Sequence, residues 1–416
     1  MDQYQNINKS LIYLSLLLFP IQILHIPIRT TAIDISSILI FLVFFISLLR
    51  NDVKKNKKFF LFFLFFFFFQ ISLLLISPAP IIRFISSAIW ISLFILLIFG
   101  NDLPIFDYKI AEKLIKVTLL ISLIIAWIQY FFIITPANYN LGVKLRSMAL
   151  FMEPSYAGLA FYSASAAFLG LFFFEKKKIK NFIYAIIFFL TGFLTLSMHI
   201  VTFSVIFFII LFFFLKQNFS YEKSFILLAT LCLIFSIANI ITNYFNIKLI
   251  DIFIGHFEGR VNLISIEGMS LSLLAWLMGF DQALYSIKTN LFLGVGLGST
   301  GEFLFDSVFK ERLNILGSGD LTLKDAFSLF FRLIVEIGFF LTISFVLYLI
   351  VKTFNVMRNL NGESFKKYIF CFIFSLSLII GSLLKEPNLG RSSLIVGIML
   401  FTRIQTQKKI FQNKND

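Results

Sequence analysis

Cysteine, histidine and charged residues are all scarce in this chain of 416 residues, which has three histidines. Its two cysteines, Cys232 and Cys371, fall in apolar stretches, which excludes a disulfide framework and suggests no metal cluster. Only 14% of the residues are charged, whereas 59% are hydrophobic and the mean hydropathy is +0.93. This composition is typical of a polytopic membrane protein and excludes a large soluble domain.

The net charge of +14 would indicate a nucleic-acid partner in a soluble chain. Here the basic residues cluster in short segments between apolar stretches, where they hold membrane topology and meet anionic headgroups. We therefore expect membrane lipid, and no nucleic acid, as a partner.

A helix needs about 20 apolar residues to cross the hydrocarbon core of a bilayer. We therefore expect one all-α integral membrane domain over 1–416, with about 12 spans. The first span is expected to be retained, since no small-residue cleavage pattern follows it. The stretch 181–215 should form a hairpin that turns near Ser197 and His199. The expected spans are 10–28, 32–49, 59–77, 82–99, 115–134, 155–174, the two halves of 181–215, 224–242, 327–351, 368–384 and 390–404.

Lysine and arginine divide differently between the two faces of this topology. Positive-inside counting puts both termini in the cytoplasm; lysine then splits twenty to six in favour of that side, and arginine three to seven against it. The arginine guanidinium binds phosphate through two parallel hydrogen bonds, whereas the lysine ammonium acts as a hydrated point charge. We therefore expect an anionic, diphosphate-linked substrate at the outer face. The outer arginines are Arg29, Arg83, Arg146, Arg260, Arg312, Arg332 and Arg391.

One outer connection, residues 243–326, is much longer than the others and is too long for a simple turn. Its segment 263–280 is apolar and amphipathic, which predicts a helix lying along the membrane surface. Arg260, Arg312 and Lys324 lie in this connection and are candidate substrate-binding residues.

The same connection contains a glycine run in which Gly294, Gly296 and Gly298 alternate with apolar residues. Either the run is a turn packed between short helices, or its successive N–H groups form a nest that binds an anion. It is no dinucleotide fingerprint, because no βαβ unit surrounds it. We include the three glycines among the candidate substrate-binding residues.

Glu153 precedes Pro154 and Ser155 at the expected start of a span. Its carboxylate either favours the helix dipole there, or serves as a base while Arg146 contacts an anion. His256 and Arg260, four residues apart, allow the same two interpretations: a surface histidine, or a base beside an arginine. Glu153, His256 and Arg146 are thus candidate catalytic residues.

Arg332 and Glu336 stand four residues apart in an expected span, hence on one face of the helix. Charges at that depth face a partner or a cavity, so the two form an ion pair, line a substrate site, or do both. Arg332 is a candidate catalytic residue and Glu336 a candidate substrate-binding residue. Acidic residues and histidines are scattered rather than set at metal-ligand spacing, which favours chemistry without a metal or cofactor.

Three pieces resemble the Wzy-type O-antigen and capsule polymerases of the O-antigen ligase/polymerase superfamily. They are the arginine-to-MEPS segment at 146–155, NLFLGVGLGS at 290–299 in a large outer loop, and FRLIVEIGFF at 331–340. The resemblance in topology covers nearly the whole chain, and the resemblance in motifs covers about a tenth of it. It implies a GT-C-like fold in the bacterial inner membrane, with the active site at the periplasmic face.

The resemblance also implies a metal-independent glycosyltransferase that moves an undecaprenyl-diphosphate-linked glycan onto a new lipid-linked repeat unit. A Wzz-type chain-length co-polymerase is the implied partner. Ligases of this superfamily, which transfer the glycan to lipid A core, carry a His-Asn pair before the Glu-x-Gly element. Here Phe327 and Ser328 stand at those positions, which counts against a ligase. A third alternative, a lipid-linked oligosaccharide flippase, should show two similar halves and short outer loops.

Overall fold

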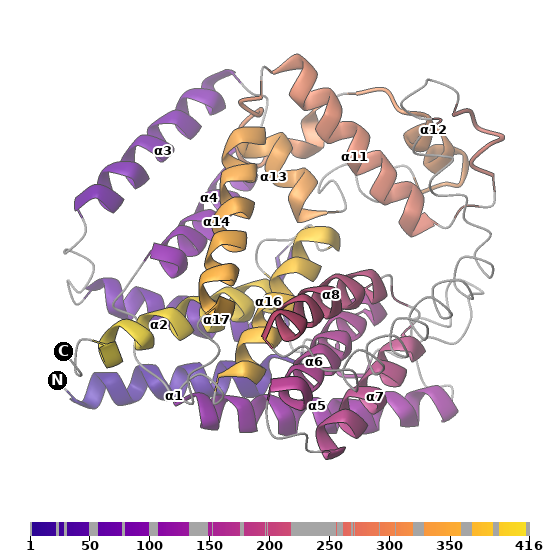
Figure 1. The fold of residues 1–416 in the computed structure, drawn as a ribbon. Coiled ribbons are helices and arrows are strands. Elements are labelled where there is room, and N and C mark those ends of the chain that lie inside the picture. Colours follow the sequence, from indigo (N-terminus) through magenta and orange to yellow (C-terminus); the bar gives the residue numbers. More distant parts are fainter. Residues whose placement is uncertain are drawn as a thin grey trace.

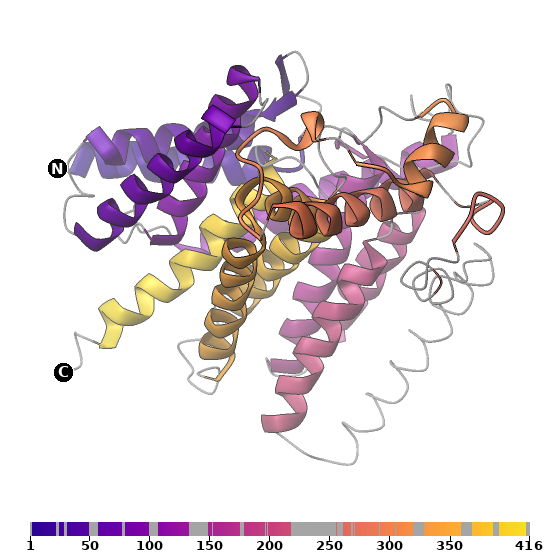
Figure 2. The ribbon, with the colours of Figure 1, turned by 90° about the horizontal axis from the view of Figure 1, so that it is seen from above.

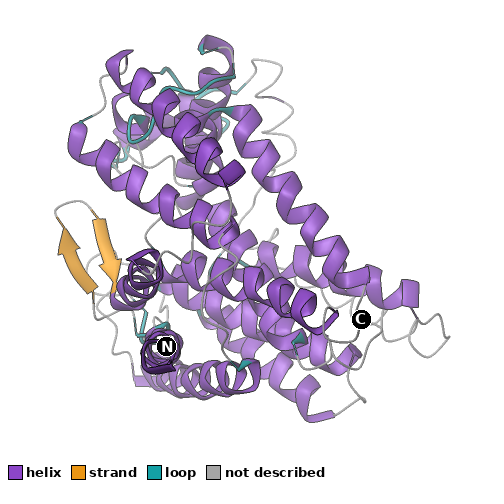
Figure 3. Cartoon of the chain, turned by 90° about the vertical axis from the view of Figure 1, so that its left-hand side faces the viewer, coloured by secondary structure: helices purple, strands orange, loops and turns teal. Residues whose placement is uncertain are grey.

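The computed structural model consists of helices and one short antiparallel hairpin (Figure 1; Figure 3). It describes residues 2–21, 25–28, 31–49, 57–76, 80–99, 107–132, 149–151, 153–174, 179–195, 197, 199–217, 255, 261–267, 269, 271–290, 292–303, 305–318, 328–358, 368–385 and 391–412. The prediction of an α-helical chain is confirmed, and the hairpin is an addition to it.

The helices are α1 (Asp2–Leu18), α2 (Ile35–Leu49), α3 (Lys57–Ile76), α4 (Ile81–Phe99), α5 (Tyr108–Phe132), α6 (Pro154–Phe174), α7 (Ile179–Leu194), α8 (Ile200–Gln217), α11 (Leu271–Thr289), the 3₁₀ turn η3 (Thr300–Glu302), α12 (Val308–Ile315), α13 (Leu329–Ile337), α14 (Phe339–Arg358), α16 (Ile369–Lys385) and α17 (Ser392–Gln412). The hairpin pairs β1 (His25–Ile28) with β2 (Thr31–Asp34), and His25 lies opposite Asp34.

Three of the described helices are long and apolar enough to cross a membrane: Tyr108–Phe132, Ser155–Phe174 and Phe339–Val356. Shorter apolar helices accompany them, among them Ile81–Leu93 and Ile369–Lys385. Apolar helices of this kind indicate association with a membrane. The prediction of about 12 spans stays a prediction, and its span 224–242 lies outside the described residues.

Helix α5 illustrates a helix that is apolar on both faces. Ala111, Ile115, Leu119 and Ala126 are completely buried at helical spacing. The opposite face carries exposed isoleucines and phenylalanines, which suit lipid rather than water. The exposed residues of α5 include Ile110, Ile121, Ile124, Ile128, Phe131 and Phe132.

Helix α6 lies at the centre of the bundle because its small residues admit close neighbours. A Cβ atom on Gly158 would lie 2.5 Å from Cβ of Ser197, in the turn after α7. The α7 backbone at Gly192 likewise sits against the Tyr162 ring, where a Cβ would lie 2.9 Å from a ring carbon. The predicted hairpin within 181–215 is confirmed, since α7 and α8 are separate helices joined near His199.

The prediction of a first helix over 10–28 is wrong at both ends. Helix α1 begins at Asp2 and ends at Leu18, and β1 occupies 25–28. Proline explains the ending, because Pro20 lacks an amide hydrogen and its ring clashes with the preceding helical turn.

The prediction of a single helix over 327–351 is also wrong, because the helix breaks at Gly338. Helix α13 ends at Ile337 and α14 begins at Phe339, and Gly338 between them has φ +90°. That backbone conformation is left-handed and strains any residue with a side chain.

Helix α11 packs against α12 and α13 and is orange-red in Figure 2. A helix was predicted nearby, over 263–280, but the observed one begins only at Leu271. Asn262 and Ser265 exchange backbone-to-side-chain hydrogen bonds of 2.9 and 3.0 Å, which close a turn and delay the helix. One side of α11 packs through Met278 against Phe309 of α12, and another packs through Trp276 against Phe331 of α13.

Candidate functional site

The glycine run packs directly against the break between α13 and α14. The amide of Val295 donates to the carbonyl of Val335 (2.7 Å), and that of Gly296 donates to the carbonyl of Glu336 (3.0 Å). The amide of Phe339 donates back to the carbonyl of Phe292 (2.9 Å). Residues 292–302, here called the clasp segment, thus satisfy backbone groups that the helix break leaves without helical partners.

Two glycines make this contact possible. A Cβ atom on Gly294 would lie 2.5 Å from the amide nitrogen of Gly338, and one on Gly338 would lie 2.5 Å from the carbonyl oxygen of Phe292. Gly294, Gly296 and Gly298 all have positive φ. Of the two interpretations, the run is therefore observed as a turn packed against a helix break, whereas an anion nest stays a prediction. The amide of Gly296 is already engaged with Glu336.

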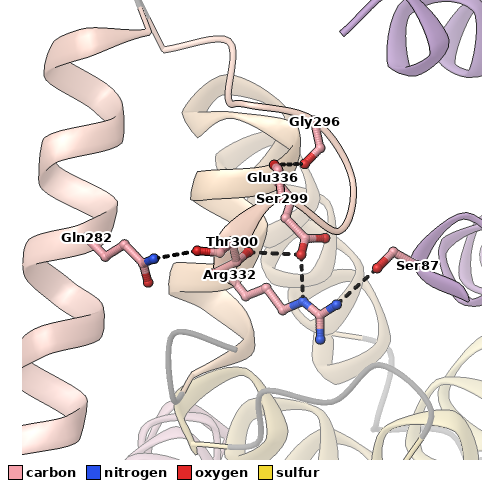
Figure 4. Close-up of polar contacts among 7 residues, drawn as sticks. All are labelled: Ser87, Gln282, Gly296, Ser299, Thr300, Arg332 and Glu336. Atoms are coloured by element: carbon pink, nitrogen blue, oxygen red, sulfur yellow. Dashed lines mark hydrogen bonds and ion pairs between the residues drawn. The ribbon is translucent and has the colours of Figure 1, made fainter. Parts of the chain in front are cut away.

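A chain of side-chain hydrogen bonds runs through the clasp segment (Figure 4). Arg332 Nε donates to Glu336 Oε1 at 2.9 Å, and Arg332 Nη2 donates to Ser87 Oγ of α4 at 3.0 Å. Thr300 Oγ1 also donates to Glu336 Oε1 at 2.9 Å. Gln282 Nε2 of α11 donates to the Thr300 carbonyl at 2.8 Å. Four elements, α4, α11, η3 and α13, therefore converge on one buried ion pair.

The ion pair is deeply buried, with Arg332 9% exposed and Glu336 0% exposed. Removing two charges from water costs several kcal/mol, and the cost is recovered only when further hydrogen bonds satisfy them. Ser87 and Thr300 supply such bonds. The prediction of an intrahelical pair between Arg332 and Glu336 is confirmed.

A second ion pair joins the clasp segment to the start of α4. Arg83 Nη1 lies 3.4 Å from Glu302 Oε1, and both side chains are partly exposed. The backbone of Gly298 touches the start of α4, where a Cβ would lie 2.6 Å from the carbonyl carbon of Arg83. Arg83 and Ser87 are one helical turn apart on α4. Two of the predicted outer arginines, Arg83 and Arg332, are thus joined to the clasp segment.

Arg391 belongs to a different cluster. Its Nη1 lies 3.4 Å from Asp34 Oδ1, and its guanidinium carbon lies 4.6 Å from the centre of the Tyr156 ring. The amide of Ser392 donates to Asp34 Oδ2 at 2.8 Å. Asp34 therefore links the β hairpin to the start of α17, and a cation–π contact adds the start of α6.

Glu153 is exposed and directly precedes α6. Its Oε2 accepts a hydrogen bond from Ser155 Oγ at 3.1 Å, and its carbonyl accepts the amides of Tyr156 and Ala157. The position at a helix start is as predicted. The role of Glu153 as a base stays a prediction.

Arg312 lies on α12, which packs on a different face of α11 from α13 (Figure 1). The structure therefore does not bring Arg312 to the Arg332 side of α11. The remaining predicted site residues lie outside the described residues. They are Arg29, Arg146, His256, Arg260 and Lys324.

Sequence reasoning missed the partners of the two buried arginines. Ser87 and Asp34 are polar residues within predicted spans, and a polar side chain in such a span usually has a partner. Thr300 lies two residues after the last glycine of the run, but neither its bond to Glu336 nor that of Gln282 to Thr300 can be predicted from local spacing. These contacts join residues 36 and 18 positions apart.

His199 lies in the turn between α7 and α8 and is buried. Its Nδ1 lies 3.4 Å from Thr202 Oγ1, and its Nε2 has no hydrogen-bond partner among the described residues. Burial, and to a smaller degree the positive charge of Lys385, hold the pKa of His199 well below its usual value of 6.5. The ring is therefore neutral at physiological pH.

No group of three histidine, cysteine or acidic side chains in the described part of the chain is arranged to hold a metal ion. Metal-independent chemistry stays a prediction. No protein-family model matches the chain, and a search of curated proteins finds no relative. The function is therefore argued from the contacts of the described residues and from the sequence motifs.

Proposed function

We propose that this protein is a polysaccharide polymerase of the bacterial inner membrane. In this proposal it is a GT-C-like, metal-independent glycosyltransferase with about 12 membrane spans, and residues 243–326 form a periplasmic loop. It transfers a glycan from undecaprenyl diphosphate onto a new lipid-linked repeat unit.

One observation carries the proposal: Arg332 is held beneath the clasp segment, next to α4, at the ends of apolar helices. Its guanidinium is fixed by Glu336 and Ser87 at 2.9 and 3.0 Å. Arg83, one turn from Ser87, lies beside the same segment. Preorganised arginines of this kind suit a diphosphate leaving group, whose charge rises as the anomeric C–O bond breaks.

The reaction needs two further events. The acceptor hydroxyl attacks the anomeric carbon of the donor glycan while its proton passes to a base within hydrogen-bond reach. Glu153 and His256 are the candidate bases, and undecaprenyl diphosphate leaves with the electron pair of the broken bond. Gly294, Gly296 and Gly298 hold the clasp segment in place over Arg332.

The test uses full-length protein in lipid nanodiscs, supplied only with lipid-diphosphate repeat units and a metal chelator. A ladder of products is expected from the wild type and from Arg403→Lys, a control at the predicted cytoplasmic end of the expected span 390–404. Arg332→Ala should give no ladder. A requirement for lipid A core acceptor would favour a ligase instead. Transbilayer movement of the lipid without new glycosidic bonds would favour a flippase.

A further inference from the structure

The carboxylate of Glu336 uses its two oxygens unequally. Oε1 accepts from both Arg332 Nε and Thr300 Oγ1, whereas Oε2 is buried and has no hydrogen-bond partner among the described residues. A carboxylate that only neutralises an arginine typically uses both oxygens and two parallel hydrogen bonds. Here Glu336 approaches from the side, through Nε. Arg332 Nη2 points away from Glu336, toward Ser87 on α4 (Figure 4).

Glu336 also ties the clasp segment to α13 at two points. Its carbonyl accepts the amide of Gly296 (3.0 Å), and its side chain accepts the hydroxyl of Thr300 (2.9 Å). The far end of the clasp segment is attached to other elements, since Gln282 holds the Thr300 carbonyl and Arg83 pairs with Glu302. Any displacement of the clasp segment therefore changes the hydrogen bonds of Glu336 at two points.

We propose that Glu336 is a positioning residue. Through it, the direction of the Arg332 guanidinium depends on whether the clasp segment is packed against α13. With Thr300 bound to Oε1, the carboxylate stays beside Nε and Arg332 Nη2 is directed to α4. Without Thr300, the carboxylate turns to pair with the terminal nitrogens and withdraws them from α4. This inference rests on the proposed role of Arg332 as a diphosphate contact.

The consequence is chemical as well as structural. The terminal nitrogens are the part of a guanidinium that binds two phosphate oxygens at once. Their direction therefore decides whether a diphosphate accepts two hydrogen bonds or is held by charge alone. Displacing such a group by about 1 Å is enough to lose much of its contribution to the reaction rate. The packing of the clasp segment against α13 thus determines the affinity of the protein for the lipid diphosphate.

The test compares three variants with the wild type in nanodiscs: Thr300→Val, which removes the hydroxyl, Thr300→Ser, which keeps it, and Glu336→Gln. Exposed Glu311→Gln on α12 is the control. The probe is undecaprenyl diphosphate without glycan. Thr300→Val and Glu336→Gln should weaken its binding about tenfold, within the usual range of coupling between linked sites. Thr300→Ser and Glu311→Gln should bind it as the wild type does.

Two further measurements separate positioning from simple support. Hydrogen exchange of residues 292–302 should be faster in Thr300→Val, and its KM for lipid-linked repeats should rise more than its kcat falls. If exchange becomes faster while undecaprenyl diphosphate binds unchanged, Arg332 does not depend on the clasp segment and the inference is overturned. If binding weakens as expected but wild-type protein makes no polymer, the inference stands and the polymerase proposal fails.

Discussion

Gly294 and Gly338 lie back to back, so that a Cβ atom on Gly294 would come within 2.5 Å of the amide nitrogen of Gly338. Neither position has room for a side chain, and both have positive φ. The contact places the clasp segment on the helix break above Arg332.

Gly338→Ala should lower the thermal unfolding temperature much more than Gly317→Ala. Both glycines have positive φ, which costs about 1–2 kcal/mol for alanine. A Cβ on Gly338 also meets the carbonyl of Phe292, whereas nothing lies within 4 Å of one on Gly317. The clash adds roughly 1–3 kcal/mol. Equal melting shifts for the two variants would show that the close contact is absent.

Arg332→Lys should restore little of the polymer length that is lost in Arg332→Ala. Lysine keeps the positive charge, but it cannot donate to Glu336 and Ser87 in the fixed directions that Nε and Nη2 use. We expect long polymer to disappear from cells while the protein remains in the membrane, as judged by gel ladders and immunoblotting. Full chain length in Arg332→Lys would mean that only the charge matters.

Asp34→Asn should loosen the hairpin from the bundle. The buried carboxylate accepts from Arg391 and from the amide of Ser392, and its neutralisation removes the negative charge that faces the buried Arg391 guanidinium. Breaking a buried pair in this way costs about 3–5 kcal/mol. Thermal unfolding should detect it, with exposed Asp306→Asn as the matched control. An equal effect of both variants would argue against the pairing.

Protein stability should fall as the pH drops below about 6.5, and part of that fall should depend on His199. The pKa of His199 is lowered in the folded protein, so above the unfolded pKa the ring is neutral in both states and has no effect. Below it the unfolded chain binds a proton that the folded chain does not. Stability then decreases by up to about 1.4 kcal/mol per pH unit.

The measurement for His199 is the melting temperature of wild type and His199→Gln at a series of pH values from neutral to acidic. The difference between the two proteins isolates the histidine from all other titrating groups. We expect the wild type to lose more stability on acidification than the variant. Parallel pH profiles would mean that the imidazole is protonated in the folded protein.

The positions of apolar residues and charges along the chain were sufficient to predict three features. These are the helical class, the hairpin of α7 and α8, and the ion pair of Arg332 with Glu336. Each of these depends on residues close in sequence: apolar runs, a short turn, and a spacing of four on one helical face. Local patterns also allowed a packed turn at the glycine run. They did not say what the backbone approaches.

The break at Gly338 and the grouping of the arginines follow from contacts between distant segments. An apolar run has the same sequence pattern whether or not a glycine within it adopts a positive φ. Here the clasp segment stabilises the break, because it supplies hydrogen bonds to the backbone groups around Gly338. Charge counting likewise sent Arg83, Arg332 and Arg391 to one face without pairing them. Arg332 and Arg391 have different carboxylate partners because burial requires each guanidinium to find a nearby acceptor, and packing alone determines which one is near.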